Sequence, residues 1–260
     1  MRRKTVIDAG LFAGLKDRDL RREGIVIAEG RLLVDRMLAS GWEVLCVLAG
    51  ARMADEYAAR AGGNVPLLVK SDAEMEALAG FRFHRGVMAA SRRPSSRTVC
   101  SCVEDNPSIE KVVICPDIGS PANLGSIMRT AAAFGYGGLI IGPQCCDPLS
   151  RMALKASMGA PFKMLLADMG DEALDCAFLK RNGFALYGTV LSESATPLHG
   201  FAPARRHALV FGNEATGLSA QWRALCDKEL TIPIESHTDS LNVGVAAGIF
   251  MHCLGGMNRD

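Results

Sequence analysis

Three short segments in the C-terminal half of the chain place an amide or a carboxylate side chain beside a glycine turn. They are Asn-Leu-Gly-Ser-Ile-Met-Arg at 123–129, Phe-Gly-Asn-Glu-Ala-Thr-Gly at 211–217, and Ile-Pro-Ile at 232–234 followed by Ser-Leu-Asn-Val at 240–243. Each lies where an expected strand gives way to a loop or a helix. Ligands of open α/β sheets bind at this carboxyl edge, so the three segments are candidates for one common site.

The first segment has a structural reading as well as a functional one. A glycine and proline turn delivers Asn123 to the expected start of a helix, where asparagine ordinarily caps the helix by accepting an amide hydrogen of the first turn. On this segment alone we favour the capping role. Arg129 is six residues further on, about 120° away around a helix of 3.6 residues per turn. A shared site therefore requires Asn123 to lie in the loop rather than within the helix.

Several common catalytic and cofactor-binding patterns do not occur in the sequence. It contains no Gly-x-Gly-x-x-Gly dinucleotide fingerprint, no Walker-type phosphate loop and no Gly-x-Ser-x-Gly nucleophile turn. The five histidines are scattered and the nine cysteines lack Cys-x-x-Cys spacing, so no metal site is expected. The missing glycine fingerprint also disfavours a nicotinamide-dependent oxidoreductase.

The elements that must position these segments form two α/β domains. In residues 1–95, strands are expected at 24–28, 44–48, 65–69 and 86–90, with helices at 31–39, 52–61 and 71–78. The third helix opens with Ser71 and Glu74 at the spacing of a capping box. A boundary falls near 91–107, where Ser-Arg-Arg-Pro-Ser-Ser-Arg and then Glu-Asp-Asn-Pro interrupt the alternation, and we interpret residues 96–107 as a linker.

The alternation of strands and helices resumes in the second domain, residues 108–260. The expected strands lie at 111–116, 139–142, 163–166, 185–190, 207–211 and 229–234, and the expected helices at 124–134, 149–158, 171–182, 220–226 and 241–254. Apolar strands alternating with helices imply a mostly parallel sheet that is covered on both faces.

Composition places the chain among ordinary globular proteins. It has 260 residues, enough for two α/β domains, of which 49% are hydrophobic and 22% charged. The N-terminus shows no sustained apolar run of a secretory signal, and no stretch approaches the length of a membrane span. The cysteine pattern fits reduced thiols in a cytoplasm. We therefore expect a cytoplasmic protein with no membrane partner.

Basic charge is concentrated toward the N-terminus. Residues 1–100 carry 17 Lys and Arg against 12 Asp and Glu, whereas residues 101–260 carry 12 against 16. Clusters of basic side chains could follow a nucleic-acid backbone, and a solvated face with a basic linker explains the charge equally well. These clusters include Arg2, Arg3, Lys4, Arg82, Arg85, Arg92, Arg93 and Arg97.

Taken in order, the three segments resemble the three motifs of the SpoU (TrmH-like) RNA 2′-O-methyltransferases of the SPOUT superfamily. The resemblance runs over roughly residues 111–254, and three motifs in sequence make it specific. In the N-terminal part, residues 26–33 and 84–90 resemble the family's substrate-binding domain, a small ribosomal-protein-like α/β module. The resemblance implies RNA as substrate, with ribosomal RNA favoured weakly over transfer RNA.

The resemblance also implies a deep trefoil knot in the C-terminal domain, whose loops bind S-adenosylmethionine in a bent shape. Matching positions assign Gly212, Ile232 and Leu241 to this cofactor, with Phe211, Ile234 and Thr189 beside them. These residue types suit the ligand, because an adenine slot needs backbone hydrogen bonds and apolar walls. Ser236 and Thr238 depart from the family pattern, which commonly has glycine and valine there, and they bear on the affinity for the cofactor.

The same matching gives Asn123, Arg129, Glu214, Ser240 and Asn242 as the active-site set. The family's candidate for activating the ribose 2′-hydroxyl is Arg129. A guanidinium normally keeps its proton, so a substrate phosphate or desolvation assists proton loss, or the arginine stabilises the developing oxyanion. We prefer the second hypothesis. Each of the others has a structural alternative: a surface carboxylate for Glu214, an N-cap for Ser240 and a first-turn polar residue for Asn242.

Two further expectations concern assembly and activity. In the family, the small-residue helix at 241–250 helps to build a two-fold homodimer, with the active site across or near the interface. The alternative to an enzyme is an RNA-binding protein on the same fold that has lost catalysis. Retention of all five active-site residues argues against that alternative.

Overall fold

A computed structural model describes residues 9–13, 16–79, 86–235 and 240–255. The chain divides into two compact units. Unit 1 comprises Met1–Ser95 together with Leu149–Lys163, and unit 2 comprises Ser96–Pro148 and Met164–Asp260. The segment 149–163, which we had expected in the C-terminal domain, therefore belongs to the unit built mainly from the N-terminal residues.

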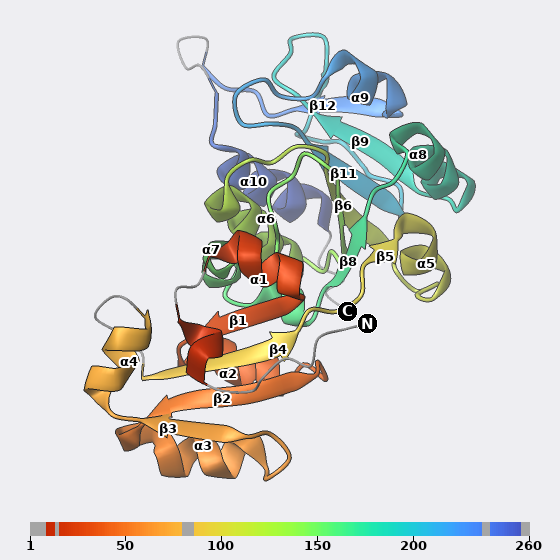
Figure 1. Ribbon diagram of the computed structural model, residues 1–260. Coiled ribbons are helices and arrows are strands. Elements are labelled where there is room, and N and C mark those ends of the chain that lie inside the picture. The colour runs from red at the N-terminus through yellow and green to blue at the C-terminus, as the bar shows by residue number, and fades with distance from the viewer. Residues whose placement is uncertain (1–8, 14–15, 80–85, 236–239, 256–260) are drawn as a thin grey trace. The chain divides into compact units, whose positions relative to one another are not determined.

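Unit 1 is built on a mixed four-stranded sheet in the order β1-β4-β2-β3 (Figure 1). The strands are β1 (Ile25–Glu29), β2 (Val44–Gly50), β3 (Leu67–Lys70) and β4 (Val87–Arg92); β4 runs antiparallel to both neighbours, and β2 pairs with β3 in parallel. The helices are α1 (Asp17–Glu23), α2 (Arg31–Leu38), α3 (Ala54–Ala61) and α4 (Asp72–Ala79), with short 3-10 turns at Ala9–Phe12 and Ala51–Met53. All four predicted strands and three predicted helices are confirmed, and α1 was not predicted.

Local sequence explains these elements well. Ile25 and Ile27 alternate along β1 toward a core that also contains Leu20 of α1 and Met75 of α4. The predicted capping box is present at α4: the amide of Ser71 donates to Glu74 Oε2 at 2.9 Å, and the amide of Glu74 donates to Ser71 Oγ at 3.3 Å.

A buried carboxylate ties the 149–163 segment into unit 1. Glu29 ends β1 with its side chain 2% exposed, and it accepts a hydrogen bond from Arg151 Nη1 at 3.1 Å and pairs with Lys155 Nζ at 2.5 Å. Both cations belong to α7 (Arg151–Ala156), which is followed by a 3-10 turn at Ala160–Phe162. The ring of Phe162 packs edge-on against Trp42 at 5.0 Å. Removing one member of such a buried group leaves an uncompensated charge and costs about 3–5 kcal/mol.

Unit 2 contains an eight-stranded sheet in the order β10-β12-β9-β11-β6-β7-β8-β5. Every pairing within the described part of this sheet is parallel, so the expected mostly parallel sheet is confirmed. The strands are β5 (Arg97–Thr98), β6 (Lys111–Cys115), β7 (Gly138–Ile141), β8 (Leu165–Asp168), β9 (Ala185–Thr189), β10 (Thr196–Pro197), β11 (His207–Phe211) and β12 (Lys228–Thr231).

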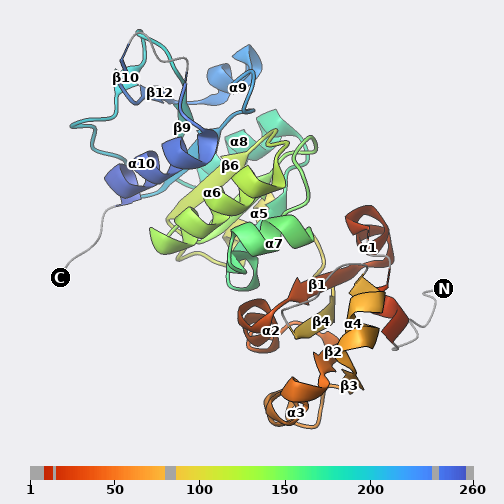
Figure 2. The ribbon, with the colours of Figure 1, turned by 90° about the vertical axis from the view of Figure 1, so that its left-hand side faces the viewer.

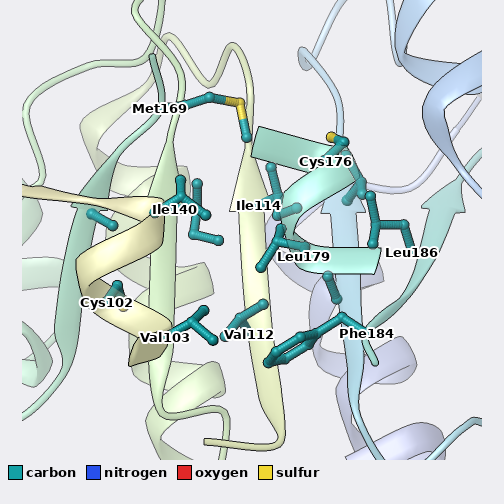
Figure 3. Close-up of a cluster of buried hydrophobic side chains, with 14 of the residues drawn as sticks. Cys102, Val103, Val112, Ile114, Ile140, Met169, Cys176, Leu179, Phe184 and Leu186 are labelled. Carbon is teal, nitrogen blue, oxygen red and sulfur yellow. The ribbon is translucent and has the colours of Figure 1, made fainter. Parts of the chain in front are cut away.

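Helices cover both faces of this sheet. On one face, α6 (Pro121–Ala133) and α10 (Val243–Gly255) pack side by side (Figure 2). The apolar residues of α6 at helical spacing, Leu124, Ile127, Met128 and Ala131, are all buried. On the other face, α5 (Val99–Glu104) and α8 (Glu172–Arg181) enclose a hydrophobic core with the strands (Figure 3). Trp222 of α9 (Ala220–Leu225) belongs to the same core.

The predicted linker at 96–107 is wrong. Its residues form β5, which joins the edge of the sheet beside β8, and α5, which begins with a capping box between Thr98 and Ser101. Val99, Cys102 and Val103 lie at helical spacing and are buried in the core. The serine, arginine and proline residues just before them suggested a loop, and the short apolar pattern that follows was too brief to outweigh them.

Within the described ranges, none of the helices has the length and apolar character needed to cross a bilayer.

Candidate active site

The three segments meet at the point where the sheet reverses its winding. β6 and β11 are neighbours, but β6 leads through α6 to β7 on one side, whereas β11 leads through α9 to β12 on the other. Connections that leave two adjacent parallel strands in opposite directions create a crevice at their carboxyl ends, and ligands of such sheets bind there. The residues after β6, β11 and β12 are those of the three motifs.

A pocket of about 490 Å³ lies at this edge. Its wall includes Thr189 at the end of β9, Phe211 and Gly212 at the end of β11, Ile232 and Ile234 after β12, and Leu241 before α10. These are the six residues that the sequence predicted for a cofactor. Glu214 and Ser240 line the same pocket.

Gly212 allows two backbone segments to approach closely at the pocket wall. A Cβ atom at this position would lie 2.3 Å from the carbonyl carbon of Gly217 and 2.4 Å from both its oxygen and the amide nitrogen of Leu218. The turn between them is closed by backbone hydrogen bonds in both directions between Asn213 and Gly217. Any side chain at 212 would therefore force the turn away from β11.

The carboxylate of Glu214 lies at the N-terminus of α6. It accepts hydrogen bonds from the amides of Gly119 at 3.2 Å and Ser120 at 3.0 Å, and from Asn123 Nδ2 at 3.0 Å. A negative charge is stabilised at this end of a helix by free amides and by the helix dipole. Partial burial is the largest single influence and raises the pKa of Glu214, but the hydrogen bonds from Asn123, Ser120 and Gly119 together hold it below its usual value.

Asn123 lies inside the first turn of α6 and links two motifs. The N-cap of the helix is Ser120, whose hydroxyl accepts a hydrogen bond from the amide of Asn123 at 3.4 Å. The predicted capping role of Asn123 is therefore wrong, because Pro121 already occupies the first helical position. The side chain is free to donate to Glu214 and to accept from Asn242 Nδ2 at 3.0 Å.

Asn242 completes the chain of side-chain contacts and begins the last helix. Its Oδ1 accepts hydrogen bonds from the amides of Gly244 at 2.9 Å and Val245 at 3.4 Å, so Asn242, and not the predicted Ser240, caps α10. A Cβ atom on Gly244 would lie 2.9 Å from Ser126 Oγ of α6. Close packing of the two helices thus brings Asn123 and Asn242 together.

Arg129 does not join this network within one chain. It lies on the exposed side of α6 and does not line the pocket. It makes no hydrogen bond or ion pair with any residue in the described part of the chain. Glu214, Asn123 and Asn242 are linked by hydrogen bonds and Ser240 shares the pocket wall with Glu214, whereas the arginine of the predicted set has none of these contacts.

Sequence reasoning missed several residues that shape the site. Asp117 Oδ2 accepts a hydrogen bond from Asn213 Nδ2 at 3.2 Å, and Asn213 Oδ1 accepts from the amides of Ala215 at 2.9 Å and Thr216 at 3.3 Å. Arg223 of α9 lines the pocket. The Gly-Asn-Glu order at 212–214 was the available signal for Asn213; no sequence pattern singled out Asp117 or Arg223.

Some sequence-based expectations fall outside the described residues. They concern Ser236 and Thr238 of the third motif, the first two residues of the segment 84–90, and the basic residues Arg2, Arg3, Lys4, Arg82 and Arg85. Within the ranges that the structure describes, no group of three or more His, Cys, Asp or Glu side chains could hold a metal ion.

The chain is similar to known RNA methyltransferases in sequence and in fold. A model of the SpoU rRNA methylase family matches residues 110–252. An uncharacterized tRNA/rRNA methyltransferase of Mycobacterium tuberculosis is 34% identical over 231 residues, which cover 87% of this chain and 79% of the relative. A 23S rRNA (guanosine-2′-O-)-methyltransferase of Acinetobacter baylyi is 32% identical over 182 residues, covering 68% and 73%. The solved AdoMet-bound rRNA methyltransferase of Sinorhizobium meliloti shares the fold with a TM-score of 0.80 at 23% identity, over 94% of this chain and 91% of that one.

Proposed function

The chain belongs to the SpoU rRNA methylase family, and we propose that it transfers the methyl group of S-adenosylmethionine to a ribose 2′-hydroxyl of RNA. One observation carries this proposal. The hydrogen-bonded series Glu214, Asn123 and Asn242 draws one residue from each motif to the edge of a pocket lined by the six predicted cofactor residues.

The pocket suits the cofactor. Phe211, Ile232, Ile234 and Leu241 provide apolar walls, and the loop at Gly212 brings backbone amides and carbonyls to the surface without an intervening side chain. An uncharged, phosphate-free adenosine needs such a surface more than it needs a cationic cradle. When bound, S-adenosylmethionine supplies an activated methyl group on a sulfonium sulfur.

The roles of the polar residues follow from their contacts. Glu214 has a lowered pKa and accepts three hydrogen bonds, so it is a weak base at neutral pH, and we assign it to holding Asn123 rather than to removing a proton. Asn123 and Asn242 orient the ribose. Arg129 stabilises negative charge on the 2′-oxygen as its proton leaves to another acceptor. Ser240 contributes a hydroxyl at the pocket wall.

The proposed role of Arg129 depends on assembly into a two-fold dimer. α10 exposes Val245 and Ile249, 54% and 36% accessible, whereas Ala247, Phe250, Met251 and Leu254 of the same helix are buried. We propose that this face and α6 meet their counterparts in a second copy, so that Arg129 of one protomer serves the pocket of its partner. We also propose the deep trefoil knot of the family for the loops after β11 and β12.

We further propose that unit 1 contacts the RNA, through basic side chains that suit a phosphate backbone. Ribosomal RNA is favoured over transfer RNA. The nine cysteines are all free thiols, which supports a role in the reducing cytoplasm.

The decisive test uses the purified protein, methyl-labelled S-adenosylmethionine and RNA from cells that lack the gene. We expect label in 2′-O-methyl nucleosides, and one ribose position that is methylated only in cells carrying the gene. Binding of S-adenosylmethionine without any methylated ribose would overturn the RNA assignment. RNA binding with no binding of S-adenosylmethionine would instead identify a catalytically silent protein on this fold.

A further inference from the structure

One charged side chain in the pocket has no part in the chemistry proposed above. Among the described residues that line the pocket, Arg223 is the sole basic residue and Glu214 the sole acidic one. Arg223 lies on α9, next to the buried Trp222, and its side chain is 41% exposed. Its guanidinium therefore reaches both the pocket and water.

Glu229, at the start of β12, holds this guanidinium in one orientation. Arg223 Nε donates to Glu229 Oε1 at 2.6 Å, and Nη2 donates to Oε2 at 2.7 Å. This is a two-pronged contact along one edge of the planar group. The pairing raises the pKa of Arg223 and lowers the pKa of Glu229, so both groups are ionised at neutral pH.

The opposite edge of the guanidinium remains available. A guanidinium has five N–H donors, and Glu229 engages two of them. Nη1 makes no hydrogen bond within the described residues. The edge formed by Nη1 and the second N–H of Nη2 has the spacing that matches the two oxygens of a carboxylate.

The methyl donor carries a group that requires such a partner. S-adenosylmethionine has an adenosine at one end and an α-amino acid with a carboxylate at the other. Within the described part of the pocket wall, Arg223 is the side chain with a positive charge to receive that carboxylate. We propose that Arg223 binds the α-carboxylate of the methyl donor through its free edge, and that Glu229 acts as the positioning residue that holds it ready. This inference rests on the proposed function.

The proposal predicts a discrimination between two ligands that differ in this one part. S-adenosylhomocysteine contains the amino-acid end, and 5′-methylthioadenosine lacks it. Arg223→Gln should raise the dissociation constant of S-adenosylhomocysteine about tenfold. This is the order expected for losing a charge-assisted contact in a partly exposed site. It should change the affinity for 5′-methylthioadenosine less than twofold.

Titration calorimetry on the full-length protein measures both dissociation constants. Arg205→Gln is the matched control, because Arg205 forms a similar exposed pair with Glu110 outside the pocket. It should change neither constant. Glu229→Gln should weaken the binding of S-adenosylhomocysteine but not of 5′-methylthioadenosine, and by a smaller factor than Arg223→Gln. The substitution loosens the orientation of Arg223 but leaves the positive charge of Arg223 in place. Arg223→Lys should fall between the wild type and Arg223→Gln.

The ratio of the two constants protects the test against loss of folding, because a misfolded pocket weakens both ligands together. If Arg223→Gln lowers the affinity for both ligands equally, or for neither, the carboxylate assignment is overturned. A change confined to the affinity for RNA would overturn it too, and would identify Arg223 as a phosphate contact. If the wild-type protein binds neither ligand, the proposed function itself fails and the inference falls with it.

Discussion

Asn242 Nδ2 donates a hydrogen bond to Asn123 Oδ1 at 3.0 Å across 119 residues of sequence. The contact joins the first turn of α6 to the capping residue of α10, two helices that follow different strands. Because Asn123 also donates to Glu214, one amide side chain ties the three motifs into a single site.

Replacing Glu214 by glutamine should lower both activity and stability. The amide group would present its own N–H to donors from Gly119, Ser120 or Asn123, so at least one hydrogen bond is lost together with the charge at the start of α6. We expect kcat to fall by at least tenfold and the free energy of unfolding by about 1–2 kcal/mol. Glu193→Gln, an exposed carboxylate in another loop, is the control and should change neither.

The same substitution has a pH signature. The pKa of Glu214 is lower in the folded protein than its ordinary value, so its stabilising contribution is present at neutral pH and is lost as the pH falls below about 4.5. Urea unfolding of the wild type and Glu214→Gln should therefore give curves that differ at pH 7 and converge in acid. A difference that stayed constant down to pH 3 would contradict the hydrogen-bonded carboxylate.

Substitutions at Arg129 should separate chemistry from cofactor binding. Arg129→Ala should lower kcat about 100-fold or more, as removal of an oxyanion donor does elsewhere. It should leave the dissociation constant of S-adenosylmethionine unchanged, because the assigned partner of Arg129 is the ribose 2′-oxygen and not the cofactor. Arg129→Lys should retain substantial activity if a point charge suffices. Near-total loss with lysine, with RNA and cofactor binding intact, would instead assign the role to the planar fork of the guanidinium.

Gly212→Ala should abolish cofactor binding and leave the structure outside this turn largely unchanged. The new methyl group would overlap the backbone of Gly217 and Leu218, and the turn that carries Glu214 would have to move. Gly200→Ala is a suitable control: that glycine has a positive φ of 77° but open space around it. It should cost about 1 kcal/mol of stability through backbone strain and leave binding intact. Calorimetric titration distinguishes the two variants.

Val245→Glu and Ile249→Glu should convert a dimer to monomers, because each would bury a charge in the proposed interface. Leu174→Glu, at a side chain that is 69% exposed on α8, should not. Sedimentation equilibrium measures the mass.

If Arg129 serves the partner's pocket, mixing Arg129→Ala with Glu214→Gln subunits should restore about a quarter of wild-type activity, since half of the dimers then contain one complete site. Absence of any recovery in exchanged dimers would place Arg129 in its own subunit's site.

Acid should destabilise unit 2 through His207. Its ring is buried. Nδ1 donates a hydrogen bond to the carbonyl oxygen of Ala204, and Nε2 accepts one from the hydroxyl of Tyr136 at 2.9 Å. Burial lowers the pKa of His207, so the unfolded chain takes up the proton first. The free energy of unfolding should fall below about pH 6.5, by at most about 1.4 kcal/mol per pH unit. His207→Gln should flatten this dependence, whereas His199→Gln, at an exposed loop position, should preserve it.

Much of the fold follows from local sequence. Apolar runs such as His207–Phe211, separated by helices with one apolar face, predicted six of the eight strands of unit 2 and their parallel arrangement. The two that were missed, β5 and β10, have two residues each, too few to show a period. The placement of α7 could not be predicted either, because its partner Glu29 is more than a hundred residues away and pairs through charges that look solvent-exposed in the sequence.

The sequence predicted only part of the candidate site. Phe211, Ile232 and Leu241 were found because their motifs resemble a family, and they line one pocket as expected. For Asn123 the sequence offered a cap and a site residue. The capping role is wrong, because the sequence does not reveal that Ser120, three residues earlier, is the N-cap of α6. The catalytic role stays a prediction. Arg223 carries no local pattern at all. Its relevance comes from the pocket and from Glu229, and both depend on tertiary contacts.

The division of the chain constrains how the two units can be exchanged. The chain passes between them after Ser95, after Pro148 and after Lys163, so a cut at one crossing leaves them joined by the other two. Recombination that replaced residues 1–95 alone would leave Arg151 and Lys155 facing a foreign sheet without Glu29. A successful graft must carry residues 149–163 with it, and the two stretches are therefore expected to vary together within the family.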